Sequence, residues 1–260
     1  MALSGKVAIV TGAAQGLGKA FTERLLQRGA RQVCVADVKV EDGQRTVSDF
    51  GQTYGKDRAT FVKCDVSNEK DLEDLFVAVK RRYGPLDIMV NNAGIANETN
   101  WSKMVDINMK GLMKGTFLAI EAMRKDTGGH GGVIVNVASS AGLTPVFCTP
   151  SYCASKYGVV GFTLSWAESR TIVDLGIRFA VMCPAFTDTE IIKLGTNSIM
   201  LQPELATKMM DFVGINKVET VSDAFMQLVD DPESNGTIAT ITANHGIRFK
   251  RHKFTNLSML

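Results

Sequence analysis

A tyrosine and a lysine form the pair in this sequence that is best suited to proton chemistry. Tyr152 and Lys156 lie four residues apart in the stretch SYCASKYGVVGF. In a helix this spacing places the two side chains on one face, one turn apart. Free tyrosine titrates near pH ~10, and a fixed ammonium beside it favours the phenolate and so lowers that pKa. Such a pair can take a proton from an alcohol or give one to a carbonyl.

A lone pair of this kind also arises by chance, so the elements around it must show whether they build a site. Short apolar runs alternate with segments of helical spacing, at residues 6–11, 32–37, 60–64, 86–90, 133–137, 177–182 and 236–242. Such runs are typical of buried parallel strands, and their alternation with helices indicates βαβ units. We predict an α/β fold: a Rossmann-type, doubly wound parallel sheet of seven strands with helices on both faces. It forms a single domain over residues 1–247, followed by a loosely ordered tail at 248–260.

A glycine-rich turn joins the first predicted strand to the first helix, with the sequence Gly12-Ala-Ala-Gln-Gly16-Leu-Gly18. Glycines permit a tight turn, and the start of a helix offers N–H groups to an anion such as pyrophosphate. Asp37 ends the second strand. At about 20 residues past such glycines, a carboxylate can accept hydrogen bonds from an adenosine ribose and repels a 2′-phosphate. A purely structural turn and a solvated aspartate are the alternative interpretations.

Three further polar positions lie at strand ends or inside a helix. Asn91-Asn92-Ala93-Gly94 follows the fourth strand, at the edge where such sheets bind ligands. Asn108 lies inside the helical segment 101–125, where a buried asparagine needs hydrogen-bond partners and a surface one does not. Ser139 follows the fifth strand, thirteen residues before Tyr152, so the strand end and the next helix can bring hydroxyl and phenol together.

A methionine-rich apolar segment at residues 188–214 lies between two core elements. We interpret it as a substrate lid or pocket wall, with ordinary core packing as the alternative.

Composition excludes several classes of protein. The 260 residues are 45% hydrophobic and 22% charged with a net charge of +2, which gives no reason to expect nucleic acid as a partner. The five cysteines are odd in number and include no CxxC, so we expect reduced thiols and a cytoplasmic location. Without a signal h-region or an apolar run of ~18 residues, we expect no membrane span. His130, His245 and His252 form no ligand cluster, so we expect no metal.

In combination and order, these motifs resemble those of the short-chain dehydrogenases/reductases, from residue 6 to about 243. The glycine turn, the Asn-Asn-Ala-Gly element and the four residues Asn108, Ser139, Tyr152 and Lys156 carry the resemblance. It implies an NAD-dependent oxidoreductase that interconverts a secondary alcohol and a ketone on an apolar substrate. It also implies a homodimer or homotetramer.

The resemblance implies roles for individual residues as well. Tyr152 would be the base, Ser139 would hold the substrate oxygen, Lys156 would bind ribose hydroxyls, and Asn108 would hold a water that links Lys156 to solvent. The implied substrate contacts are Ser139, Thr149, Tyr152 and Phe186. The implied cofactor contacts are Gly12, Gln15, Gly16, Leu17, Gly18, Asp37, Val38, Cys64, Asp65, Val66, Asn92, Ala93, Gly94, Tyr152, Lys156, Pro184, Thr187 and Thr189.

Two positions depart from the family pattern. Ala185 stands where a glycine usually follows the proline after the sixth strand. Thr149 stands where the branch of the family with the most similar stretches carries a substrate-contacting glutamine. The substrate therefore stays open among that branch's substrate, hydroxysteroids, retinoids and other carbonyl compounds. Lys39 is the one nearby charge that favours NADPH and a reductase. A non-catalytic NAD-binding regulator is the alternative of another class.

Overall fold

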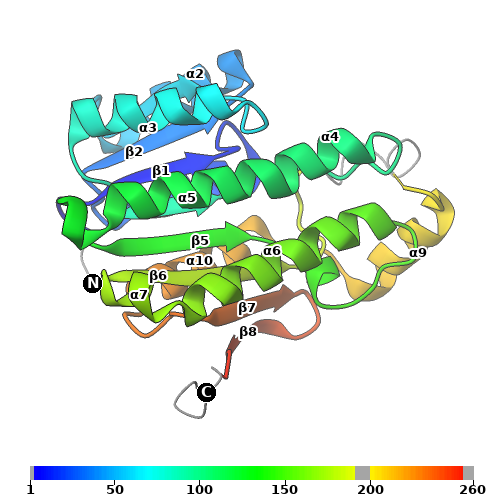
Figure 1. Cartoon of the computed structure of the whole chain (residues 1–260). Coiled ribbons are helices and arrows are strands. Elements are labelled where there is room, and N and C mark those ends of the chain that lie inside the picture. The colour runs from blue at the N-terminus through cyan, green and yellow to red at the C-terminus, as the bar shows by residue number, and fades with distance from the viewer. Residues whose placement is uncertain (1–2, 191–199, 254–260) are drawn as a thin grey trace, which may run out of the picture.

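A sheet of eight strands runs through the centre of the molecule (Figure 1). The computed structural model describes residues 3–190 and 200–253. The strand order is β3-β2-β1-β4-β5-β6-β7-β8. The first seven strands are parallel, and their bounds are β1 Val7–Thr11, β2 Gln32–Asp37, β3 Ala59–Lys63, β4 Ile88–Asn91, β5 Gly132–Val137, β6 Ile177–Pro184 and β7 Thr237–Thr242. The α/β prediction is thus confirmed.

The predicted count of seven strands is wrong, because an eighth strand adds to the edge of the sheet. This strand, β8 (Gly246–Arg251), pairs antiparallel with β7, from Thr242 opposite Gly246 to Thr237 opposite Arg251. Residues 248–251, assigned from the sequence to a loose tail, lie in it, and residues 254–260 lie outside the described residues. Its outer half is exposed and rich in Arg and Lys, which guards an open edge against pairing with another chain and leaves little apolar pattern to detect.

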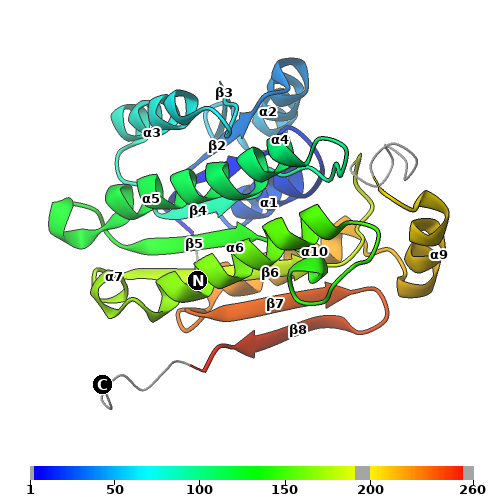
Figure 2. The ribbon, with the colours of Figure 1, turned by 45° about the vertical axis from the view of Figure 1, so that its right-hand side comes forward.

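Helices cover both faces of the sheet. On one face, α1 (Gly16–Gln27), α2 (Val40–Tyr54) and α10 (Val218–Asp230) bury Phe21, Phe50 and Phe225 against β-strand side chains. On the other face lie α3 (Glu69–Tyr83), α5 (Leu112–Met123) and α6 (Pro150–Glu168). Figure 2 shows α5 and α6 side by side on this second face. The short α7 (Arg170–Asp174) follows α6.

The predicted helical segment 101–125 is divided into three pieces. These are α4 (Trp101–Val105), the π-helical turn η1 (Asp106–Gly111) and α5. Two 3₁₀ turns, η2 (Lys125–Thr127) and η3 (Ser140–Gly142), flank β5. π-helical turns occur mostly as single insertions in α-helices, frequently at functional sites. The π-helical turn contains Asn108, which is one of the predicted site residues.

The sheet has its switch in strand order between β1 and β4, where ligands bind in open α/β folds. The carboxyl ends of β1, β2, β4, β5 and β6 are followed by the predicted site motifs. Of the predicted lid at 188–214, residues 203–213 form helix α9 (Pro203–Val213), whereas residues 191–199 lie outside the described residues. None of the described helices combines the length and apolar character that a membrane crossing requires.

A glycine in α2 offers a test of this packing. A Cβ on Gly43 would lie 2.1 Å from Cε2 of Phe61, so we expect Gly43→Ala to lower the free energy of unfolding by about 1–3 kcal/mol. Gly51, in the same helix, is the matched control. A Cβ there would lie 3.6 Å from the nearest atom, and Gly51→Ala should stabilise by about 0.5–1 kcal/mol. Urea denaturation of both variants measures the difference, and equal effects would contradict the packing described.

Candidate active site

The structure places Tyr152 and Lys156 together at the start of α6. The Nζ atom of Lys156 lies 5.6 Å from the centre of the Tyr152 ring and donates a hydrogen bond of 2.9 Å to the carbonyl of Val137 in β5. The phenol of Tyr152 is hydrogen-bonded to the hydroxyl of Ser139, just past β5. That hydroxyl also lies 3.3 Å from the carbonyl of Pro184 in β6. The structure therefore brings phenol and hydroxyl together, as their spacing predicts.

Burial dominates the titration of both groups. It raises the pKa of Tyr152 to about 12, while the hydrogen bond from Ser139 acts in the opposite direction. It lowers the pKa of Lys156 to about 8. The net pKa of Tyr152 is thus raised, whereas the pair alone predicts a lowered value, because desolvation of the phenol is the largest effect and Lys156 is itself buried and bonded to Val137. Burial therefore favours the neutral phenol over the phenolate.

Asn108 lies fully buried in the π-helical turn η1. Its Nδ2 donates to the carbonyl of Ile95 at 2.8 Å and to Oγ of Ser155 at 3.3 Å, and its Oδ1 accepts from the N–H of Ile95 at 2.9 Å. A Cβ on Gly94 would lie 3.2 Å from Oδ1 of Asn108 and 3.5 Å from Nζ of Lys156. The glycine thus leaves these two polar atoms facing one small space.

The glycine turn is closed by backbone contacts that only glycine allows. Gly12 has a φ of +63°, and a Cβ on Gly18 would lie 2.3 Å from the carbonyl oxygen of Gly12. The side-chain amide of Asn92 donates to the carbonyls of Thr11 and Gly12 at 2.9 and 3.0 Å. Asn92, predicted to contact the cofactor, therefore uses its Nδ2 to fix the turn.

The start of α1 beside this turn is open. Its N-cap residue, Gln15, makes no side-chain capping bond, and no acidic residue lies in the first turn. Asp37 sits next to it, with its carboxylate accepting from the backbone N–H of Ala14 at 2.9 Å and of Lys39 at 3.0 Å. The ammonium of Lys39 donates to the side-chain oxygen of Gln15 at 3.0 Å. The uncapped N–H groups suit the pyrophosphate of a dinucleotide, and the fixed carboxylate, about 20 residues past the glycines, suits its adenosine ribose.

The other predicted cofactor residues lie along the same edge of the sheet. The methyl of Thr189 would lie 3.6 Å from a Cβ on Gly16, so the segment after β6 reaches the glycine turn. The hydroxyls of Thr187 and Thr189 donate to backbone carbonyls of that same segment. After β3, the carboxylate of Asp65 accepts a hydrogen bond from the N–H of Ser67. Three of the remaining residues are packed into the protein: Leu17 lies against the core, and Cys64 and Val66 are buried. The N–H of Ala93 is bonded to the hydroxyl of Thr11, whereas the side chain of Val38 is exposed.

The predicted substrate contacts gather where α6 begins. Thr149 is buried, with its hydroxyl 4.0 Å from Sγ of Cys153. The carbonyl of Phe186 accepts from the backbone and the side-chain amide of Asn216 at 2.8 and 3.0 Å, which fixes the start of the predicted lid. Leu201 donates its N–H to the carbonyl of Cys148 at 3.1 Å, so the far part of that segment returns to the same place.

Two residues of the site have no assignment from the sequence. The hydroxyl of Thr11 accepts from the N–H groups of Asn92 and Ala93, both at 3.1 Å, and so joins the ends of β1 and β4. The carboxylate of Glu98 accepts from the N–H of Tyr152 at 2.8 Å. The position of Thr11 before the glycine turn is a signal that could have found it, whereas a single glutamate in a loop offers none.

A dinucleotide fits these residues on a structural ground: the Gly12–Gly18 turn is so tight that a Cβ at either end would meet protein backbone, and the N–H groups that it presents at the start of α1 have no side-chain cap. Among residues 3–190 and 200–253, no group of three or more His, Cys, Asp or Glu side chains is arranged to hold a metal ion.

Comparisons with known proteins agree with this arrangement. The family model described as short chain dehydrogenase matches residues 6–197. The chain is 40% identical to 15-hydroxyprostaglandin dehydrogenase (NAD⁺) of Mus musculus, over 99% of this chain and 97% of the mouse protein. It is 38% identical to the protein of the same name from Homo sapiens, over 98% and 97%.

A less similar sequence and a solved structure also match the chain. The chain is 35% identical to 3beta-hydroxysteroid dehydrogenase 2 of Eggerthella lenta, over 73% of this chain and 74% of that protein. The crystal structure of levodione reductase superposes with a TM-score of 0.81 at 26% identity, covering 93% of this chain and 97% of that one. With the site geometry and the full-length similarity in agreement, the chain belongs to the short-chain dehydrogenase family.

Proposed function

We propose that this protein oxidises a secondary alcohol on an apolar skeleton to the ketone, with NAD as hydride acceptor. The observation that carries the proposal is the meeting of Tyr152, Ser139, Lys156 and Asn108 beside an open glycine turn. The similarity to 15-hydroxyprostaglandin dehydrogenases (NAD⁺) over nearly the whole chain supports the proposal. A 15-hydroxyprostaglandin is therefore the first substrate to test.

Each group has a defined task in this reaction. Ser139 holds the substrate oxygen next to the Tyr152 phenol, and the Tyr152 phenolate accepts the hydroxyl proton. The glycine turn and Asp37 would hold NAD, which would supply the acceptor for the hydride of the carbinol carbon. Lys156 binds ribose hydroxyls and, with Asn108, faces the space beside Gly94 where a water relays the proton towards solvent.

The pH dependence of the two directions follows from these pKa values. Because burial raises the pKa of Tyr152 to about 12, the proton-accepting phenolate is scarce at neutral pH and grows as pH rises. Lys156, with a pKa lowered to about 8, loses its charge above that pH and then no longer favours the phenolate. We expect kcat/KM for alcohol oxidation to rise from pH 6 and to flatten above about pH 8, and ketone reduction to fall over the same range. Initial rates at constant ionic strength check this, and oxidation that slows as pH rises would contradict it.

Asp37 is the residue to which we assign the preference for NAD. Its carboxylate is fixed by the backbone N–H groups of Ala14, before α1, and of Lys39, before α2, and a 2′-phosphate beside it would meet like charge. We expect Asp37→Ser to raise the ratio of NADP to NAD affinity by at least about tenfold, since like-charge contact costs several kcal/mol. Lys39 lies alongside to meet the added phosphate. Asp42→Ser removes a neighbouring carboxylate, 4.0 Å from Lys39, as the control. Equal NAD and NADP affinities in the unmodified protein would remove the basis for this assignment.

The substrate is the least constrained part of the proposal. Thr149 is shorter than the glutamine of the prostaglandin enzymes and cannot make the same contact, so a hydroxysteroid is the second candidate, and the 3beta-hydroxysteroid relative supports it. A screen of 15-hydroxyprostaglandins, hydroxysteroids and retinoids with NAD, followed by the absorbance of the reduced cofactor, tests both. Turnover of none, with NAD bound, would overturn the proposal in favour of a non-catalytic regulator.

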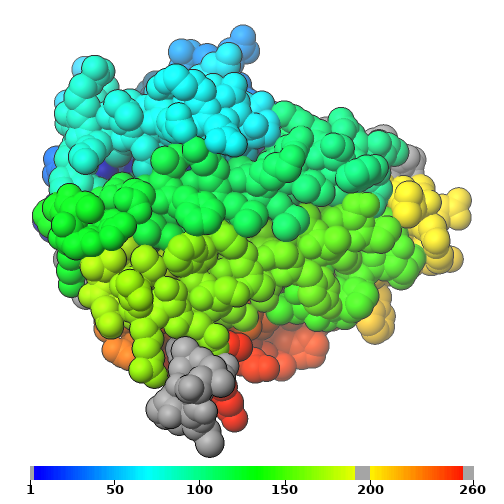
Figure 3. All heavy atoms as spheres, viewed as in Figure 1, coloured from blue at the N-terminus to red at the C-terminus, as the bar shows by residue number. Residues whose placement is uncertain are grey.

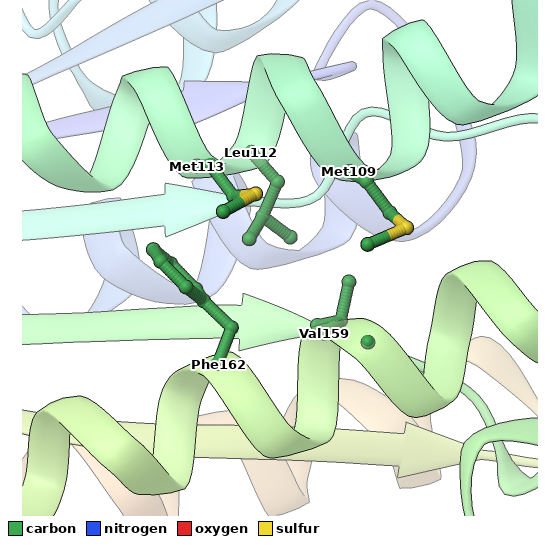
Figure 4. A pocket seen from close by; sticks show the side chains of 6 residues that line it. Met109, Leu112, Met113, Val159 and Phe162 are labelled. Atoms are coloured by element: carbon green, nitrogen blue, oxygen red, sulfur yellow. The ribbon is translucent and has the colours of Figure 1, made fainter.

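We also propose a homodimer or homotetramer built on the outer face of α5 and α6. Figure 3 shows this face, with the green α5 directly beside the yellow-green α6. Phe117 and Tyr157 expose 48% and 42% of their surface there, and Figure 4 shows the apolar hollow of Met109, Leu112, Met113, Gly158, Val159 and Phe162 between the helices. Phe117→Lys should lower the mass measured by light scattering, whereas Phe212→Lys, at an 84% exposed site on α9, should not. A monomeric parent protein would refute the assembly.

The compartment that we propose is the cytoplasm. All five cysteines are free and buried in the structure, which suits a reducing environment.

A further inference from the structure

Glu98 is a buried carboxylate that the reaction described above does not use. It lies in the loop between β4 and α4 and exposes 7% of its surface. Its Oε2 accepts from the backbone N–H of Ser151 at 3.1 Å, and its Oε1 accepts from the backbone N–H of Tyr152 at 2.8 Å. In the described part of the chain, no cation lies within ion-pair distance of it. Its charge is therefore balanced by the start of α6.

The start of α6 has no other cap. Thr149, the N-cap residue, makes no side-chain capping bond, and the first turn contains no acidic residue. Pro150 has no N–H, and the N–H of Cys153 is bonded to the carbonyl of Thr149 at 2.9 Å. The two N–H groups that remain are those of Ser151 and Tyr152, and Glu98 binds both. A residue more than fifty positions earlier in the chain thus completes this helix.

The loop that carries Glu98 is tied to the site at a second point. Three residues before Glu98, Ile95 is held by Asn108 through bonds of 2.9 and 2.8 Å. One residue further back, Gly94 lies against Asn108 and Lys156. The loop therefore joins the proton route proposed above to the residue that accepts the proton, and the joining bond is to the backbone of Tyr152 itself.

We propose that Glu98 is a positioning residue: it fixes the backbone of Tyr152 so that the phenol meets Ser139 and the substrate oxygen. The inference rests on the proposed function. Displacing a reacting group by about 1 Å can cost 10²-fold in rate. Because Glu98 binds the main chain at Tyr152 and does not touch the glycine turn or Asp37, its loss should lower kcat far more than it lowers the affinity for NAD.

The test compares Glu98→Ala and Glu98→Gln with Asn68→Ala. Asn68 is the matched control, since its side chain caps α3 by accepting from the N–H groups of Lys70 and Asp71 and makes no contact with α6. We expect Glu98→Ala to lower kcat by about 10–100-fold with NAD affinity within about twofold of the parent. The glutamine variant keeps one accepting oxygen and should fall in between; it also serves if the alanine variant does not fold. Asn68→Ala should lower only the thermal midpoint.

Hydrogen exchange gives a second readout that does not depend on turnover. The amides of residues 150–156 should lose protection in Glu98→Ala and keep it in Asn68→Ala. Unchanged protection in Glu98→Ala would overturn the proposal, as would lost protection with the parent kcat, which would make Glu98 an ordinary cap. If the parent protein turns over no alcohol in the screen, the proposed function fails, whereas the exchange result still decides whether Glu98 holds the start of α6.

Discussion

Replacing Tyr152 with phenylalanine is expected to slow alcohol oxidation by about 10³-fold and to leave NAD affinity unchanged. The substitution removes the hydroxyl to which we assign the transfer of the proton, while the ring keeps its packing. The glycine turn and Asp37, where we place the cofactor's pyrophosphate and ribose, are untouched. Stopped-flow turnover together with NAD binding by calorimetry measures the two effects separately.

The matched control for that variant is Tyr157→Phe. Tyr157 lies five residues further along α6 and exposes 42% of its surface, so its hydroxyl should not affect turnover. If the Tyr152→Phe variant kept the turnover of the parent protein, the proposed proton transfer by Tyr152 would be wrong. Loss of activity in both variants would point to damage of the helix instead.

Replacing Lys156 with methionine is expected to abolish most activity and yet to stabilise the fold. Burial lowers the pKa of Lys156 from 10.5 to about 8, so the folded chain at pH 7 holds a cation that the unfolded chain solvates better. That cost is full below about pH 8 and shrinks as pH rises towards the unfolded value. Removing the charge should gain about 2–3 kcal/mol, less about 1 kcal/mol for the lost bond to Val137.

Two measurements separate these effects. Thermal unfolding at pH 7 should show a midpoint a few degrees above that of the parent, and the gain should shrink at pH 10. Turnover should fall by about 10²-fold or more. A Lys156→Met variant that is less stable than the parent at pH 7 would show that the ammonium is well solvated or better paired than the structure indicates.

Much of this architecture can be predicted from the sequence, because buried parallel strands carry a strong apolar signal. The runs around Val7–Thr11 and Ile177–Pro184 are almost wholly buried, and their order with the helices defines the fold. β8 has no such signal, since its outer residues are exposed and charged. The π-helical turn around Asn108 is likewise invisible in a pattern that is helical on both sides.

The pKa shifts and the long-range contacts of the site could not be predicted from the sequence. The spacing of Tyr152 and Lys156 predicts their proximity but not how deeply each is buried, and burial reverses the expected direction of the tyrosine pKa shift. Glu98 meets Tyr152 only because the loop after β4 folds across the start of α6. The glycine turn and Asp37 are easier to locate from the sequence, because they follow the ends of β1 and β2 directly.

The most direct test of the central claim measures both products in one sample. Purified protein is incubated with NAD and a 15-hydroxyprostaglandin, hydroxysteroid or retinoid, and the ketone and the reduced cofactor are quantified together. We expect equal amounts of the two from at least one of these alcohols, and neither from the Tyr152→Phe variant. Bound NAD with neither product from any alcohol in the panel would contradict the assignment of this site to alcohol oxidation.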